Sequence, residues 1–354
     1  MIPAPGEGTG HQGTTQTAAL TSGGHLKVLP GWILHISNGG SMQDERPDFR
    51  PVSGTWTSHR LQLHFLEWGE PSAPPVLLVH GVRDHARNWD WVAARLARDF
   101  RVIVPDMRGH GDSEWAMGSN YGLLDHVFDL SQLLEQQQLQ GVHVIAHSLG
   151  ATHASVLAGV WPGRMASLTL IEGVAGLHHF YKKDHSVQSR IRSWIKGTAE
   201  LADRQPRRYR KVEEAVERLQ RAHPHLDPHK AEHLARHGAR RNGDGTWSWK
   251  YDNYTRSRSP FDFPYDQMVE LWEEISCPVL MINGSRGYPF RIGQNGSDAF
   301  FRHSRVVEIP DAGHWVHHDQ LEPFMGLLQE FLPPGRAAAP VPPQSRTRES
   351  SGPA

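Results

Sequence analysis

The sequence has a single cysteine, no long apolar run and almost no net charge. Of 354 residues only Cys277 is cysteine, so no disulfide can form within the chain. No stretch approaches the ~18 consecutive apolar residues that a membrane-spanning helix needs. The N-terminus lacks the basic region and apolar run of a secretory signal. With 37 Lys and Arg against 38 Asp and Glu, the net charge of −1 gives no general attraction to nucleic acid or anionic lipid.

These absences leave a cytoplasmic enzyme with a small-molecule substrate as the default expectation. We expect no nucleic-acid or membrane partner, and either a monomer or a homodimer.

Residues 1–48 are rich in Gly, Thr, Ser and Gln and have little apolar periodicity, so they are expected to be disordered. Met42 begins a more ordinary sequence and is an alternative start. Residues 333–354, rich in Pro and Ala, are expected to form a disordered tail.

Between these ends, short apolar runs alternate with helical patterns. The expected strands are 61–68, 75–79, 100–104, 142–146, 165–171, 278–282 and 306–309, and the expected helices are 89–98, 121–138, 149–161 and 321–331. Buried strands that alternate with helices predict an α/β fold with a mostly parallel central sheet and helices on both faces. The core is therefore assigned to residues 49–175 and 266–332.

Residues 176–265 interrupt this alternation and contain no convincing buried strand. Because ninety residues are too many for a loop inside a compact domain, we expect a helical cap inserted after the strand that ends at Ile171. Its aromatic side chains either line an apolar substrate pocket or form the cap's own small core. They are Phe180, Tyr181, Trp194, Trp247, Trp249 and Tyr251.

The strongest signal for chemistry is a predicted strand followed by Ala146-His147-Ser148-Leu149-Gly150 and a predicted helix. This pattern (small residue-x-Ser-x-Gly between a strand and a helix) is that of a nucleophile elbow, whose tight turn needs small flanking residues. Ala146 stands where glycine is usual. Ser148 would project above the sheet, and the N–H of Leu149 at the helix N-terminus would point at a developing oxyanion.

Two further signals lie at strand ends. His80-Gly81-Val82 follows the strand 75–79, and the N–H of Val82 is the expected second oxyanion donor, whereas His80 is expected to be structural. His314, in the segment Ile309 to Trp315, follows the last strand at the sheet edge where open α/β sheets place their sites. It could take the proton from Ser148 as general base. In the segment 106–113, Asp106 and Arg108 are expected to hold loops.

Together, these motifs resemble the α/β-hydrolase superfamily over roughly residues 50–332, less the insertion. The chain resembles the branch with a cap after the sixth strand, which includes esterases, carbon–carbon bond hydrolases, epoxide hydrolases and haloalkane dehalogenases. The cap and the ending Gly-His-Trp-Val-His-His at 313–318 look most like the serine hydrolase-like proteins. In related dehalogenases and epoxide hydrolases the nucleophile is an aspartate, and dehalogenases carry Asn and Trp where this chain has Val82 and Leu149. Ser148 therefore favours an ester, thioester, amide or carbon–carbon bond.

The third member of the triad departs from the family pattern. The acid usually follows the seventh strand, where this chain has Gly287. Some relatives carry it after the sixth strand, where Glu172 stands here, and its carboxylate could hold the tautomer of His314. Asp298 and Asp311 are weaker candidates. The alternative is that Glu172 faces solvent or the cap.

The sequence thus predicts a serine hydrolase that cleaves a small-to-medium apolar carbonyl compound, most simply a carboxylic ester, through an acyl-enzyme. The alternatives are a carbon–carbon bond hydrolase and a catalytically weak ligand-binding protein on a hydrolase scaffold. The candidates are Ser148, His314 and Glu172 for catalysis, Val82 and Leu149 for the oxyanion hole, and Phe180, Tyr181 and Trp315 for the substrate pocket.

We expect neither a metal nor an organic cofactor. Histidines recur every four residues, at His225, His229, His233 and His237, and therefore share a helix face. Such pairs can hold zinc or nickel. Since they do not form the His-Glu-x-x-His motif of a zinc protease, a solvated helix face is the preferred interpretation.

Overall fold

A computed structural model describes residues 50–118, 121–174, 186–202, 204–257, 259, 263–289, 291–292 and 296–332. Its centre is an eight-stranded sheet of order β1-β2-β4-β3-β5-β6-β9-β10. The strands are β1 (Val52–Ser58), β2 (Leu61–Trp68), β3 (Pro75–Val79), β4 (Arg101–Pro105), β5 (Val142–His147), β6 (Met165–Ile171), β9 (Val279–Gly284) and β10 (Ser304–Ile309). β2 pairs antiparallel with both β1 and β4, and the other pairs are parallel. The predicted fold class is confirmed.

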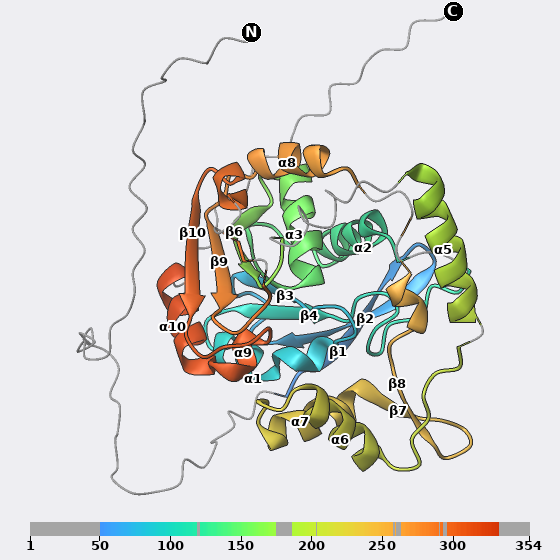
Figure 1. Cartoon of the computed structure of the whole chain (residues 1–354). Coiled ribbons are helices and arrows are strands. Elements are labelled where there is room, and N and C mark those ends of the chain that lie inside the picture. Colours follow the sequence, from blue (N-terminus) through green and yellow to red (C-terminus); the bar gives the residue numbers. More distant parts are fainter. Residues whose placement is uncertain are drawn as a thin grey trace, which may run out of the picture. The chain divides into compact units, whose positions relative to one another are not determined.

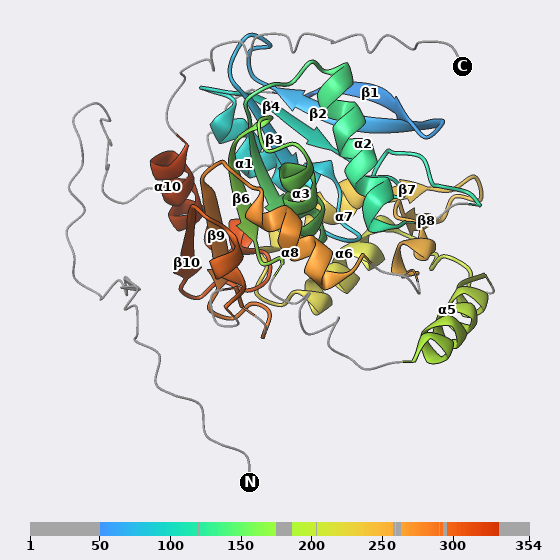
Figure 2. The same ribbon diagram turned by 90° about the horizontal axis from the view of Figure 1, so that it is seen from above.

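Helices cover both faces of this sheet (Figures 1 and 2). One face carries α2 (Leu123–Gln136), α3 (Leu149–Val160) and α8 (Tyr265–Glu273), and the other carries α1 (Asp90–Leu96), α9 (Val316–Asp319) and α10 (Leu321–Phe331). Short 3-10 helices lie at η1 (Ala86–Trp89), η2 (Asn253–Arg256) and η3 (Ser297–Phe300). Each face buries its own apolar cluster, because both sides of the central strands are apolar. No helix among the described residues is long and apolar enough to cross a membrane.

The segment between β6 and α8 was predicted to be purely helical, and its described residues contain a small sheet as well. We use 'cap' below only as a name for residues 186–257. Its helices are α5 (Val187–Ala202), α6 (Val212–Ala222) and α7 (Pro228–Gly238), and β7 (Ala239–Arg241) pairs antiparallel with β8 (Trp247–Trp249). The expectation of helices alone was therefore wrong. Two three-residue strands are too short to show a period of two, whereas the turn between them carries Asn-Gly and Asp-Gly at residues 242–245, which is a strong hairpin signal.

Helix α7 joins the cap to the core through polar contacts. His85 Nε2 donates to the Leu234 carbonyl at 3.0 Å, and His233 Nε2 lies 2.9 Å from Asp90 Oδ2. Lys230 Nζ donates to the His318 carbonyl at 2.7 Å. The predicted solvated histidine face is thus wrong for His233, which faces the core. His225 precedes α7 and does not share its face.

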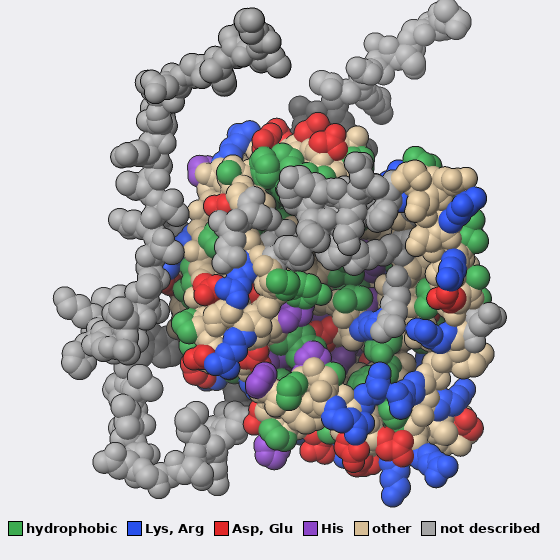
Figure 3. Space-filling model, in the orientation of Figure 1, with side chains coloured by type: hydrophobic (Ala, Val, Ile, Leu, Met, Phe, Trp, Pro, Cys, Tyr) green, Lys and Arg blue, Asp and Glu red, His purple; other side chains and the backbone are tan. Residues whose placement is uncertain are grey.

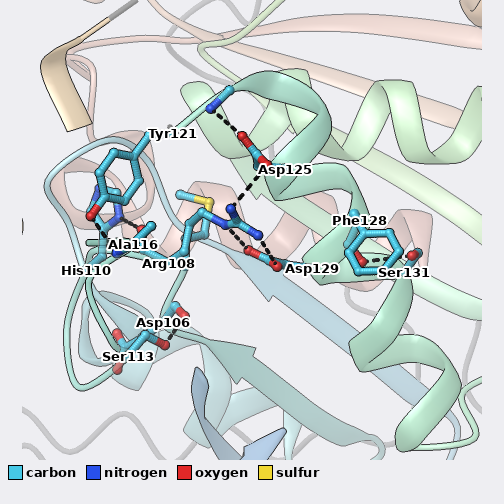
Figure 4. A network of polar contacts seen from close by, with 12 residues as sticks. Asp106, Arg108, His110, Ser113, Ala116, Tyr121, Asp125, Phe128, Asp129 and Ser131 are labelled. Carbon is cyan, nitrogen blue, oxygen red and sulfur yellow. Dashed lines mark hydrogen bonds and ion pairs between the residues drawn. The ribbon is translucent and has the colours of Figure 1, made fainter. Parts of the chain in front are cut away.

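The loop after β4 is anchored by buried charges (Figure 4). The guanidinium of Arg108 donates to both carboxylate oxygens of Asp129 on α2, at 2.5 and 2.6 Å, and lies 3.2 Å from Asp125. Asp106 accepts from the backbone N–H of Ala86 at 2.7 Å and of Asp112 at 3.0 Å. Both residues hold loops, as predicted, because a buried carboxylate or guanidinium requires such partners.

Candidate active site

Ser148 occupies a strained turn between β5 and α3. Its backbone has φ 54° and ψ −118°, a region that costs a non-glycine residue about 1–3 kcal/mol and is found at functional sites. The turn leaves no room for larger neighbours, because a Cβ on Gly150 would overlap the carbonyl oxygen of His80. A Cβ on Gly81 would lie 3.1 Å from the Cβ of Ser148. The sequence motif is therefore the product of steric crowding around this serine.

His314 reaches Ser148 from 166 residues further along the chain, and Glu172, which directly follows the neighbouring strand β6, contacts His314. Nε2 of His314 lies 3.0 Å from Oγ of Ser148, and Nδ1 of His314 lies 3.3 Å from a carboxylate oxygen of Glu172. Glu172 is 9% exposed, and its carboxylate accepts from the N–H groups of Gly284 at 2.6 Å and Tyr288 at 2.8 Å. These two donors fix the carboxylate where it can orient the imidazole.

The carboxylate of Glu172, after β6, and a side chain at position 287, after β9, would compete for the same space. A Cβ added to Gly287 would overlap both carboxylate oxygens of Glu172. The carboxylate thus occupies the space that a side chain at position 287 would need. Glu172 also adopts a left-handed backbone, with φ 49°, which is a further strained position at the site.

The weaker acid candidates have other neighbours. Asp298 lies in η3, where its carbonyl accepts from the N–H of Phe301 at 3.1 Å. The carboxylate of Asp311 lies 2.5 Å from the guanidinium of Arg286, and both side chains are exposed. Of the three acids considered, Glu172 is the one that the structure brings to His314.

The two expected oxyanion donors flank the same serine. Leu149 is the first residue of α3, so its N–H has no acceptor within the helix and points out of the positive end of the helix dipole. Val82 follows Gly81, which packs against Ser148, and its side chain is 45% exposed. A substrate oxygen above Ser148 could accept from both N–H groups.

His147 is a positioning residue that sequence reasoning missed. Its Nε2 donates to the carbonyl oxygen of His314 at 2.8 Å, and the two rings lie 4.6 Å apart. Burial and the neighbouring His314 and His317 hold the pKa of His147 well below its usual value, so its ring is neutral and keeps its proton on Nε2. The residue before the nucleophile therefore anchors the loop that carries His314, which its place in the motif alone did not reveal.

A pocket lies where the core loops meet the cap. It is lined by residues 83–85, which follow Val82, by Trp315, which follows His314, and by cap residues that include Leu234, Trp249 and Tyr251. Trp315 stacks on His223 of the cap at 4.1 Å between ring centroids. Figure 3 shows histidine side chains gathered at the centre of this face, beside α6 and α7. Of the three residues predicted for a substrate pocket, Trp315 lines this pocket, and Phe180 and Tyr181 lie outside the described residues.

Among the described residues one group brings three possible metal ligands together: His64, Asp106 and Asp112, with ligand atoms within 4.8 Å of one another. These side chains already have partners, because His64 Nδ1 bonds Asp106 at 2.7 Å and Asp112 pairs with Lys250 at 2.7 Å. We interpret the group as part of the loop scaffold.

Comparison with known proteins identifies the family of the chain. A sequence model of the alpha/beta hydrolase fold matches residues 74–321, and the chain belongs to this family. It is 28% identical to a 3-hydroxybutyrate-oligomer hydrolase of Cupriavidus necator over 72% of this chain and 87% of the relative. It is 27% identical to esterase Rv0045c of Mycobacterium tuberculosis over 75% of this chain and 85% of the relative. The chain is a hydrolase.

Solved structures show the same fold. A thioesterase domain from the curacin biosynthetic pathway superposes with a TM-score of 0.68 at 23% identity, over 79% of this chain and 99% of that domain. The structure of the M. tuberculosis esterase gives a TM-score of 0.66 at 23% identity, over 80% of this chain and 92% of that one.

Proposed function

We propose that this chain is a serine hydrolase that cleaves carboxylic esters with a small-to-medium, largely apolar acyl group. The observation that carries the proposal is the hydrogen-bonded series from Ser148 Oγ to His314 Nε2 and from His314 Nδ1 to Glu172. A hydroxyl beside an imidazole that a buried carboxylate orients is the arrangement that nucleophilic acyl transfer needs.

In the proposed reaction, His314 accepts the proton of Ser148 as Oγ attacks the ester carbonyl carbon. The carbonyl oxygen becomes an oxyanion that accepts from the N–H groups of Val82 and Leu149. When this intermediate collapses, His314 returns the proton to the departing alcohol and an acyl-serine remains. In deacylation, water loses a proton to His314 and attacks the acyl carbon. As the acid is released, His314 returns that proton to Ser148 Oγ, which restores the free enzyme. The Glu172 carboxylate, 3.3 Å from His314 Nδ1, stabilises the imidazolium that forms in each half of the cycle.

One observation favours an ester as the scissile bond, and another favours an apolar chain beside it. One relative is named an esterase. The pocket beside the site carries Trp249, Tyr251 and Trp315, which suit an apolar chain. A carbon–carbon bond hydrolase would use the same three residues. The contact between Glu172 and His314 favours an enzyme over the alternative of a catalytically weak binding protein.

The test is hydrolysis of 4-nitrophenyl esters from acetate to decanoate by the wild type and by Ser148→Ala. We expect turnover with a chain-length optimum in the wild type and loss of turnover in the variant, with an unchanged circular dichroism spectrum. Equal activity in the two proteins would rule out Ser148 as nucleophile. If the wild type cleaves none of these esters, the ester assignment fails and a carbon–carbon bond becomes the leading candidate.

A further inference from the structure

The loop that follows Val82 holds an unusual concentration of unsatisfied polar atoms. Within the described residues, Arg83 Nε and His85 Nδ1 are buried and have no hydrogen-bond partner. Asp84 Oδ2 and Asn88 Nδ2 are buried as well, and the one partner available to them is the side chain of the other residue. Buried polar groups in folded proteins are nearly always paired, so each exception needs an explanation. Three of these residues, Arg83, Asp84 and His85, line the pocket between core and cap.

The loop also lies close to the reacting atoms. Arg83 is bonded directly to Val82, and consecutive Cα atoms are about 3.8 Å apart. Trp315, which also lines the pocket, is bonded directly to His314. A substrate whose ester sits on Ser148 could therefore extend one end into this pocket.

Arg83 is held in a strained conformation above an aromatic ring. Its backbone has φ 59°, which costs a residue with a Cβ and is concentrated at ligand-binding sites. Its guanidinium carbon lies 5.4 Å from the centroid of the Tyr251 ring, which also lines the pocket. This stacking holds the flat guanidinium in place and leaves its N–H groups at the edge for an acceptor.

Asp84 adds a second donor. The residue is 6% exposed, its Oδ1 accepts from the N–H of His85 at 2.9 Å, and the side-chain amide of Asn88 also donates to the carboxyl. Burial raises the pKa of Asp84 to about 8, an effect that nearby Asp106 reinforces, while the His85 N–H and the nearby Asn88 amide oppose it. The carboxyl is therefore mostly protonated at pH 7 and can donate its O–H.

The pocket consequently has a positive balance. Arg83 and Lys250 line it, and the acid that lines it, Asp84, is mostly neutral at pH 7. Lys250 is 2.7 Å from Asp112, which is more than half exposed, so its charge is only partly compensated. A guanidinium and a protonated carboxyl both donate hydrogen bonds, and an ionised carboxylate accepts both.

We propose that Arg83 and Asp84 form a subsite for a carboxylate carried by the substrate, at the end remote from the ester bond. The inference rests on the proposed ester hydrolysis and narrows its substrate class to esters that bear a free carboxylate, on either the acyl or the alcohol side. The aromatic side chains of the pocket then cover the apolar chain between the two groups.

Matched ester pairs test this subsite. On the acyl side, the mono(4-nitrophenyl) ester of adipic acid is compared with 4-nitrophenyl hexanoate, which has a methyl group in place of the carboxylate. On the alcohol side, the butyrate ester of 4-hydroxybutanoate is compared with butyl butyrate by titration of the released acid. We expect the wild type to favour the carboxylate member of at least one pair by about tenfold or more in kcat/KM.

Variants then assign the preference to its residues. Arg83→Gln, which removes the charge but keeps a similar length, should abolish the preference, whereas Arg204→Gln on the exposed surface of the cap should retain it. Asp84→Asn should retain most of it because the amide still donates, and Asp84→Leu should reduce it. No preference in either pair, or an unchanged preference in Arg83→Gln, would overturn the subsite.

The two proposals fail in different ways. If uncharged esters are cleaved through Ser148 without a preference for the carboxylate member, ester hydrolysis stands and the subsite is wrong. If no ester is cleaved, calorimetric titration with adipate still tests the subsite. Binding to the wild type that Arg83→Gln abolishes would support it, and absence of binding to the wild type would overturn it.

Discussion

Glu172→Gln removes one charge and changes almost no volume, so it isolates the role of the carboxylate. The glutamine oxygen can still accept from one backbone donor, Gly284 or Tyr288, which now lie 2.6 and 2.8 Å from the two carboxylate oxygens. Tyr288 and His314 share one carboxylate oxygen in the wild type. If the glutamine NH2 takes the place of that oxygen, it meets the N–H of Tyr288 and the N–H at Nδ1 of His314, and two donors cannot bond each other. The imidazole can avoid this by moving its proton from Nδ1 to Nε2, so that Nδ1 accepts from the amide.

That change places the imidazole proton on Nε2, which faces Ser148 at 3.0 Å. A protonated Nε2 cannot take the serine proton, so the general base is lost. In a serine protease the equivalent change lowers kcat by about 10⁴-fold through the wrong tautomer. We expect a loss of about 10³–10⁴-fold here, or about 4–5.5 kcal/mol in the activation free energy.

The assay is kcat on 4-nitrophenyl butyrate from pH 6 to 9, with urea unfolding of each variant to control for stability. Glu172→Asp is the matched control, because it keeps the charge and retracts it by one methylene. We expect its kcat to lie between those of the wild type and Glu172→Gln. A loss below tenfold in Glu172→Gln would refute the reasoning and move the acid to another residue.

Two further predictions concern packing and pH. Gly287→Ala should displace the Glu172 carboxylate and lower kcat more than tenfold. Its control is Gly326→Ala, where no heavy atom lies within 4 Å of the new Cβ; this variant should retain kcat and stabilise α10 by about 0.5–1 kcal/mol. Equal kcat in the two variants would contradict the steric argument. Burial lowers the pKa of His80 and of His153 to about 3, so below pH ~6.5 the unfolded chain binds protons that the folded chain does not, and stability falls as pH falls. The contribution of each residue should fall by about 2 kcal/mol between pH 7.5 and pH 5. The check is urea unfolding of the wild type and of His153→Gln at these two pH values: if the free energy of unfolding of the variant falls by as much as that of the wild type, the His153 ring is not buried and neutral.

Much of the fold and the candidate site could be predicted because both depend on local patterns. The buried strands are continuous apolar runs between turn residues, and β6 and α10 begin and end where the sequence indicated. Ser148, His314 and Glu172 each follow a strand, and parallel strands bring their carboxyl ends to one edge. Position after a strand was therefore sufficient to nominate them.

The rest depends on contacts between residues far apart in the chain. The role of His147 requires the carbonyl of His314, 167 residues away, and the partner of His233 is Asp90, 143 residues away. No periodicity in the sequence records such contacts. Gly287 is another such case, because the reason for a glycine at this position is the Glu172 carboxylate, which occupies the space of a side chain there.

The most direct test of the account is covalent labelling of the nucleophile by a fluorophosphonate, followed by mass spectrometry of the labelled peptide. A fluorophosphonate transfers its phosphonyl group to an activated serine and releases fluoride, so it reports activation of Ser148 without any assumption about the substrate. The account predicts one adduct on Ser148, its absence in Ser148→Ala, and strongly slowed labelling in His314→Ala and Glu172→Gln. Labelling at another residue, or equal labelling rates in wild type and His314→Ala, would contradict it.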